Sequence, residues 1–109
     1  MKIYYTYSEK LPKTTVEKVV NTIESAHGTV SHRLRPKEYA NFDFHEAEEI
    51  YRENVKKVKA CDVVIADVSF LSSGVGYEIS LALDEKKPVI VMYNLREYDK
   101  DKEYLVKYV

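Results

Sequence analysis

The sequence predicts an α/β fold, in which helices cover both faces of a parallel β-sheet in three layers. Short runs rich in β-branched and aromatic residues alternate with segments whose apolar residues recur at helical spacing. One run, 62–67, holds four consecutive apolar residues between two aspartates, which is typical of a strand buried on both faces. The length of 109 residues suits a single domain over 1–109.

The first half of the chain predicts two strands around one helix. Residues 2–7 form the first strand, and a helix follows that begins with a capping box at Thr14. The apolar positions of this helix are Val16, Val19, Val20 and Ile23. Gly28 is expected at its C-terminal cap. Residues 29–34 form the second strand, and 35–44 form a loop.

The second half predicts two further helices, each followed by a strand. A helix over 43–60 carries an apolar stripe at Ala47, Ile50, Tyr51 and Val58. After the strand at 62–67 come a loop over 68–74 and a helix over 75–86, buried along Val75, Ile79, Ala82 and Leu83. Residues 88–93 form the fourth strand, and the polar tail beyond it is expected to hold a short final helix.

This alternation predicts right-handed crossovers and a flavodoxin- or Rossmann-like sheet of four to five strands, in the order 2-1-3-4 and possibly 5. In that order the topological switch point lies between the first and third strands. Ligands of such sheets bind beyond the carboxyl ends of the strands at this point. The loops after Tyr7 and Ala66 are therefore the expected place for a site.

Composition excludes several classes of function. A net charge of −1 argues against a nucleic-acid or membrane surface driven by bulk charge. No apolar stretch approaches the ~20 residues of a membrane span, and no signal peptide is recognisable. The lone Cys61 is expected to be a buried small hydrophobe and fits a reducing compartment, so we expect a cytoplasmic protein. The histidine spacing suggests no metal site, and no cofactor is expected.

The segment after the third strand combines hydroxyl groups, glycines and the start of a helix. Ser72, Ser73, Gly74 and Gly76 lie where free backbone N–H groups and a positive helix end can hold an anion such as a phosphate. An ordinary strand-to-helix turn is an equally good interpretation of these residues alone.

Glu78 sharpens the interpretation. It lies three residues after Val75 and four before Ala82, on the side of the helix that packs. An inward carboxylate needs partners. Ionised at a ligand pocket, it can act as a nucleophile or stabilise developing positive charge. The alternative is a glutamate that only stabilises the helix dipole.

The stretch "CDVVIADVSFLSSGVGYEISLAL" resembles the signature of the nucleoside 2-deoxyribosyltransferase superfamily, and is most similar to its 2′-deoxynucleoside 5′-phosphate N-hydrolase branch. The resemblance is dense over about 50–92. It implies that Glu78 is the nucleophile that attacks the anomeric carbon of a deoxyribose and expels the base. It further implies that Ser8, Ser72 and Gly74 hold the 5′-phosphate and that Tyr4 lies beside the nucleophile.

One position departs from the resemblance at the site, whereas Asp67 stands where the family has Glu or Asp. The family has an aspartate 24 residues before the nucleophile, where this chain has Asn54. An amide donates and accepts hydrogen bonds but cannot serve as a general acid. Asp67, at the end of the third strand, is either a substitute acid or a partner of the following loop, and we favour the loop role.

The first loop also departs, because Glu9 and Lys10 stand where the family has a Gly- and Arg-rich run. The chain also ends soon after the fourth strand, where family members usually continue into a fifth strand and a last helix.

Three functions follow as hypotheses. The first is cleavage of the N-glycosidic bond of a nucleoside or its 5′-monophosphate, with release of the sugar by water or by a second base. The second is a nucleotide-binding or regulatory module impaired in catalysis by Asn54. The third is a glycosidase acting on a nicotinamide nucleotide. Because related enzymes form dimers, a homodimer or higher homo-oligomer is expected.

Overall fold

The computed structural model describes residues 1–26, 28–32, 44–70, 72–94 and 104–108. In chain order the elements are β1 (Lys2–Thr6), α1 (Lys13–Ala26), β2 (Thr29–His32), α2 (Phe44–Ala60), β3 (Val63–Asp67), α3 (Ser73–Asp84), β4 (Val89–Asn94) and β5 (Tyr104–Tyr108). The predicted loop over 35–44 lies almost wholly outside the described residues, as do His27 and the segment 95–103.

The strands form one sheet in the order β2-β1-β3-β4-β5. The pairs β1–β2, β1–β3 and β3–β4 are parallel, which confirms the predicted order 2-1-3-4. The fifth strand is antiparallel to β4. The expectation of a short helix in the tail is therefore wrong over 104–108. The sequence there, "YLVKY", is rich in β-formers, and it pairs with an edge of β4 that would otherwise be open.

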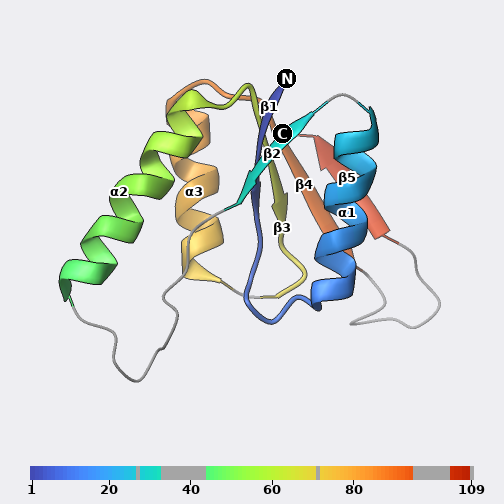
Figure 1. Ribbon diagram of the computed structural model, residues 1–109, viewed down its shortest axis with the longest axis horizontal. Helices are drawn as coiled ribbons and strands as arrows, with labels where there is room; N and C mark the ends of the chain where they lie inside the picture. Colours follow the sequence, from blue (N-terminus) through green and yellow to red (C-terminus); the bar gives the residue numbers. More distant parts are fainter. Residues whose placement is uncertain (27, 33–43, 71, 95–103, 109) are drawn as a thin grey trace.

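Helices cover both faces of the sheet. Figure 1 shows α2 and α3 side by side on one face and α1 on the other. Successive side chains of a strand point to opposite faces. Accordingly, Ile3 and Tyr5 of β1 pack toward valines of α1, whereas Tyr4 packs with Val58 of α2 and Ala82 of α3. This alternation decides which polar groups can meet at the site.

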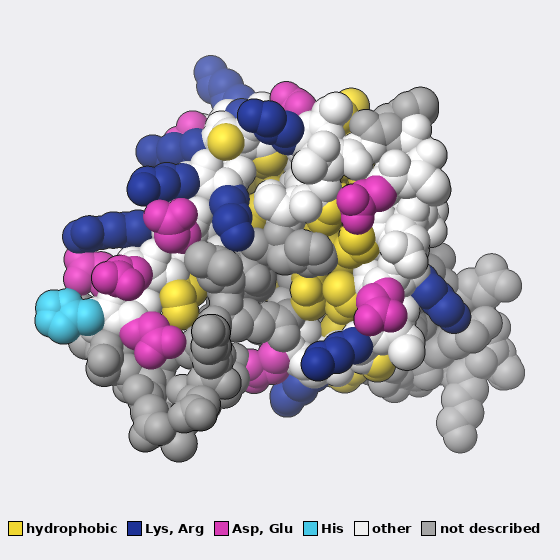
Figure 2. All heavy atoms as spheres, viewed as in Figure 1, with side chains coloured by type: hydrophobic (Ala, Val, Ile, Leu, Met, Phe, Trp, Pro, Cys, Tyr) yellow, Lys and Arg dark blue, Asp and Glu magenta, His cyan; other side chains and the backbone are white. Residues whose placement is uncertain are grey.

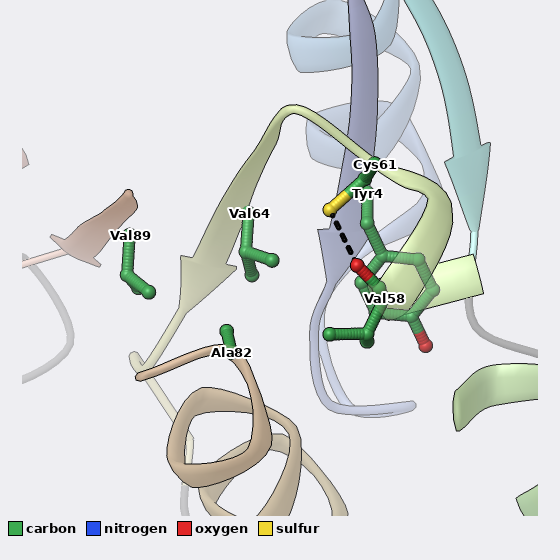
Figure 3. Packing of buried hydrophobic residues seen from close by; sticks show 6 residues of the cluster. All are labelled: Tyr4, Val58, Cys61, Val64, Ala82 and Val89. Carbon is green, nitrogen blue, oxygen red and sulfur yellow. Dashed lines mark hydrogen bonds between the residues drawn. The ribbon is translucent and has the colours of Figure 1, made fainter. Parts of the chain in front are cut away.

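One part of the core lies between the sheet and the helices α2 and α3. Figure 3 shows Tyr4 of β1 beside Val58, with Ala82 facing Val64. Cys61 belongs to this cluster and is 3% exposed, which confirms its prediction as a buried small residue. Burial raises the pKa of its thiol.

Several predicted details are wrong. The first helix begins at Lys13, so Thr14 lies inside the first turn, and the carbonyl of Pro12 accepts the first hydrogen bonds. Tyr51 and Leu83 were predicted to be buried and are exposed. Each follows the inward residue of its helix by one position, about 100° around the axis.

The outer face of α2 carries charges of both signs. Figure 2 shows basic and acidic side chains intermixed along the side of the molecule where α2 lies. Arg52 pairs with Glu48 and Lys56 with Glu53, and all four side chains are well exposed. Such pairs contribute little to stability. No described helix has the length and apolar character needed to cross a membrane.

Candidate active site

Glu78 is a buried carboxylate aimed at the sheet. The helix α3 starts at Ser73 because the Ser72 side chain caps it, accepting a hydrogen bond from the Val75 amide at 3.3 Å. This start places Glu78 on the inner face of α3 with Val75 and Ala82. The residue is 3% exposed. A group so buried requires hydrogen-bonding partners.

Two hydroxyl groups of β1 supply those partners. The Tyr4 hydroxyl donates to Glu78 Oε2 at 3.0 Å, and Thr6 Oγ1 donates to Glu78 Oε1 at 2.6 Å. Tyr4 and Thr6 are two residues apart on the strand, so they share one face of the sheet. Both are fully buried. Each carboxylate oxygen of Glu78 therefore accepts a hydrogen bond from the sheet.

Sequence reasoning missed Thr6. The signal that could have found it is the period of two along β1, which places Thr6 on the same face as Tyr4. The sequence does not show which residue of α3 lies opposite Thr6 on that face.

Asn54 lies on α2, beside the helix that carries Glu78. It is 5% exposed and stands one turn before Val58, as Glu78 stands one turn before Ala82. Val58 and Ala82 belong to one packed cluster with Tyr4, and α2 contacts both α3 and β1. Asn54 and Glu78 thus each lie one helical turn before a residue of this cluster, on neighbouring helices.

An aromatic pair joins the same two helices on their outer side. The hydroxyl oxygens of Tyr51 and Tyr77 are 2.5 Å apart, and their ring centroids are 5.4 Å apart. The hydrogen bond with Tyr51 raises the pKa of the Tyr77 phenol. Tyr77 directly precedes Glu78, and Tyr51 precedes Asn54 by three residues. The pair therefore fixes α2 against α3 at the level of the site.

Asp67 lies on the other face of the sheet. It alternates with Ala66 and shares the face of Ile65, which packs toward α1. Its strand partner Met92 packs on that face too. Its Oδ1 accepts a hydrogen bond from the Ser69 amide at 2.9 Å, whereas Oδ2 has no hydrogen-bond partner among the described residues. The structure thus brings Asp67 to the loop and not to Glu78.

The serines and glycines predicted to hold phosphate lie at the same end of the sheet as the site. Ser8 follows β1 and Ser72 follows β3, and these strands are neighbours. The hydroxyl of Ser8 accepts a hydrogen bond from the Lys10 amide at 3.2 Å. Ser73, Gly74 and Gly76 belong to the first turns of α3, so the predicted loop over 68–74 ends two residues early.

Gly76 is exposed, and a Cβ placed on it would meet nothing within 4 Å. The packing of the described residues therefore does not require a glycine there, and the part of Gly76 in phosphate binding stays a prediction. No group of three or more metal-ligating side chains occurs among the residues that the structure describes.

Comparison with known proteins identifies the family. The family model described as nucleoside 2-deoxyribosyltransferase matches residues 6–106. The chain belongs to this family. The matched residues make up most of the chain, and the match confirms the resemblance seen in the sequence.

A curated relative and two solved structures extend the comparison. The chain is 43% identical over 47 residues to a Methanosarcina barkeri protein named "Putative 2'-deoxynucleoside 5'-phosphate N-hydrolase 1". That match spans 43% of this chain and 30% of the relative. A 2-deoxyribosyltransferase from Bacillus psychrosaccharolyticus superposes with a TM-score of 0.70 at 17% identity, over 85% of this chain and 72% of that one.

A second solved structure, of a 2-deoxyribosyltransferase from Leishmania mexicana, gives a TM-score of 0.63 at 17% identity. It covers 89% of this chain and 70% of that one. At this identity the two structures show that the fold is shared, with the sheet order of a deoxyribosyltransferase-like α/β domain.

Proposed function

We propose that this member of the nucleoside 2-deoxyribosyltransferase family cleaves the N-glycosidic bond of a nucleoside or, preferably, a deoxynucleoside 5′-monophosphate. One observation carries the proposal: Glu78 is buried at the carboxyl edge of the sheet with both oxygens held by hydroxyls of β1. A carboxylate held in this way is preorganised to react with an electrophilic carbon.

The chemistry proceeds in two displacements. A carboxylate oxygen of Glu78 bonds to C1′ of the sugar while the C1′–N bond breaks and its electron pair leaves with the base. Water then attacks C1′, the bond to Glu78 breaks, and the electron pair returns to the carboxylate. The proton lost by water passes to the released base or to solvent. In a transferase a second base would take the place of water.

Hydrolysis is preferred over transfer because "SSGVGYE" matches the hydrolase branch of the family. The 43% identity to the Methanosarcina barkeri protein supports the same preference over the segment that it covers.

The 5′-phosphate would lie between Ser8 and the start of α3. The first N–H groups of this helix and its positive end favour an anion there. Because the Ser72 and Ser8 hydroxyls already accept hydrogen bonds from backbone amides, each can still donate its own proton to a phosphate oxygen.

Asn54 would orient the sugar or the base through its amide. It cannot deliver a proton as a carboxylic acid does, and such a proton typically contributes about 10²–10⁴-fold to the rate. This residue favours a second candidate function, a nucleotide-binding or regulatory module with little turnover. We also propose that the protein acts as a homodimer in the cytoplasm.

The deciding experiment is base release from a panel of nucleosides and 5′-monophosphates, followed by chromatography, with wild type and Glu78→Ala. We expect release by the wild type and none by the variant. Equal release by both proteins would refute the catalytic proposal. Nucleotide binding by the wild type with no release from any substrate would favour the binding module.

A further inference from the structure

We propose that the hydrogen-bonded pair Tyr51 and Tyr77 holds the turn of α2 that carries Asn54 in place during base release, which makes both tyrosines positioning residues. The proposal rests on the proposed function, because there Asn54 orients the substrate whose glycosidic bond Glu78 breaks.

The two halves of α2 differ in burial. Asn54 is buried and Val58 is fully buried in the core. Among the described side chains at 45–53, by contrast, none is buried. Figure 1 shows the beginning of this helix at the margin of the molecule. Asn54 is therefore the first buried residue among those described in α2, and the turns before it belong to the kind of segment that opens at a lower free energy than the core.

The tyrosine pair joins this peripheral half of α2 to α3. The hydroxyl oxygens of Tyr51 and Tyr77 lie 2.5 Å apart and share a hydrogen bond, and the two rings are in tilted contact. Tyr51 lies less than one helical turn before Asn54, and Tyr77 adjoins Glu78. The pair therefore links the turn that leads into Asn54 to the turn of α3 that carries Glu78.

This link matters because the proposed site draws groups from two helices. A substrate has to meet Asn54 of α2 and Glu78 of α3 at the same time, and small errors in such placement slow a reaction. Loosening the turn before Asn54 shifts its amide, whereas Glu78 stays where the core holds α3. The tyrosine pair favours the placement of α2 in which both groups reach the substrate.

The exposure of the pair limits the size of the effect. Tyr51 is 50% exposed and Tyr77 is 43% exposed, so water competes for both hydroxyl groups. The net contribution of an ordinary hydrogen bond corresponds to a factor of about 2 to 10 in an equilibrium. We therefore expect the loss of this bond to slow base release by about 2- to 10-fold.

A double-mutant cycle separates the positioning of Asn54 from a general effect on the structure. Tyr51→Phe keeps the ring and removes one hydroxyl of the pair, and it is made alone and together with Asn54→Ala. The value of kcat/KM for base release is measured for all four proteins on the substrate that the wild type cleaves best. Arg52→Gln is the matched control, because Arg52 pairs with Glu48 of the same helix, and that pair does not join α2 to α3.

We expect Tyr51→Phe to lower kcat/KM about 2- to 10-fold when Asn54 is present. It should have no effect in the Asn54→Ala background, where no amide is left to position. Tyr77→Phe should behave like Tyr51→Phe, and the two changes together should cost no more than either alone, because both remove the same hydrogen bond. Arg52→Gln should match the wild type.

Three outcomes would overturn the inference. Equal losses from Tyr51→Phe with and without Asn54 would show that the pair acts on the fold in general. Wild-type kinetics in Tyr51→Phe and Tyr77→Phe would show that the hydrogen bond has no part in the reaction. Absence of base release by the wild type itself would overturn the proposed function, and with it this inference, whereas the first two outcomes leave the proposed function intact.

Discussion

The hydroxyl of Tyr4 donates a hydrogen bond of 3.0 Å to Oε2 of Glu78, across 74 positions of the chain. The contact ties the first strand to the third helix inside the core. It exists because Tyr4 faces α2 and α3, while its neighbours Ile3 and Tyr5 face α1. A residue of the core thus also becomes a residue of the site.

Tyr4→Phe should fold and lose most of its activity. The ring keeps its packing in the cluster with Val58, and the hydroxyl that donates to Glu78 is removed. We expect the rate of base release to fall about 10- to 100-fold. Steady-state kinetics by chromatography checks this, with thermal unfolding as the control for structure. A well-folded Tyr4→Phe with wild-type kinetics would mean that Oε2 does not need this donor.

Asn54→Asp should increase base release from substrates with neutral bases. A carboxylic acid at this buried position of α2 restores a group that can protonate the departing base, and we expect a gain of at least about 10-fold. The variant should also lose activity as this acid ionises with rising pH. Asn54→Ala, whose side chain can neither form a hydrogen bond nor transfer a proton, should be slower than wild type. If Asn54→Asp and Asn54→Ala are equally slow, position 54 serves to bind and not to transfer protons.

Gly76→Ala should stabilise the protein while weakening phosphate binding. Gly76 lies inside α3 with no positive φ, and an added Cβ has open space. Alanine in a helix interior is favoured over glycine by about 0.5–1 kcal/mol. Urea denaturation should show this gain in the free energy of unfolding. The value of KM should rise more for a 5′-monophosphate than for its nucleoside, and an equal effect on both would place the phosphate elsewhere.

Tyr51→Phe should lower the pKa of Tyr77 toward the usual 10.0, because the main cause of its rise is the hydrogen bond between the two hydroxyls. A phenol whose pKa is raised on folding contributes stability below its usual pKa and loses it as pH rises through the raised value. The hydrogen bond between the two hydroxyls should therefore stabilise the protein at neutral pH, and this stabilisation should be lost in alkali. Ring-labelled NMR titration of Tyr77 measures the shift, and an unchanged Tyr77 in Tyr51→Phe would contradict this cause.

Much of the fold was predictable because its signals are local. Apolar runs and helical spacing gave the alternation of elements, and the rules for parallel crossovers gave the order 2-1-3-4. A fifth strand was allowed for, but its place at 104–108 and its antiparallel direction were not predicted, because its polar surroundings hide a short segment whose pairing depends on the distant edge of β4. Leu83 and Tyr51 were misplaced because each adjoins an inward position on its helix.

The candidate site was predictable only in part for a similar reason. Glu78 stands out because of its motif, whereas a threonine in a strand, such as Thr6, is ordinary until the contact with α3 is known. The alternation of Ala66 and Asp67 along the strand could have predicted that Asp67 lies on the face of the sheet opposite Glu78. The amide at position 54 is visible in the sequence, but its burial on the helix next to α3 follows from the packing of α2 and α3 around one cluster.

The most direct test of the central claim is to quench the wild-type protein during turnover of a deoxynucleoside 5′-monophosphate and measure its intact mass. The account predicts an added deoxyribose phosphate, mapped by peptide sequencing to Glu78, and its absence in Glu78→Ala. Base release by a wild type whose adduct maps to another residue, or an equal adduct in Glu78→Ala, would contradict it.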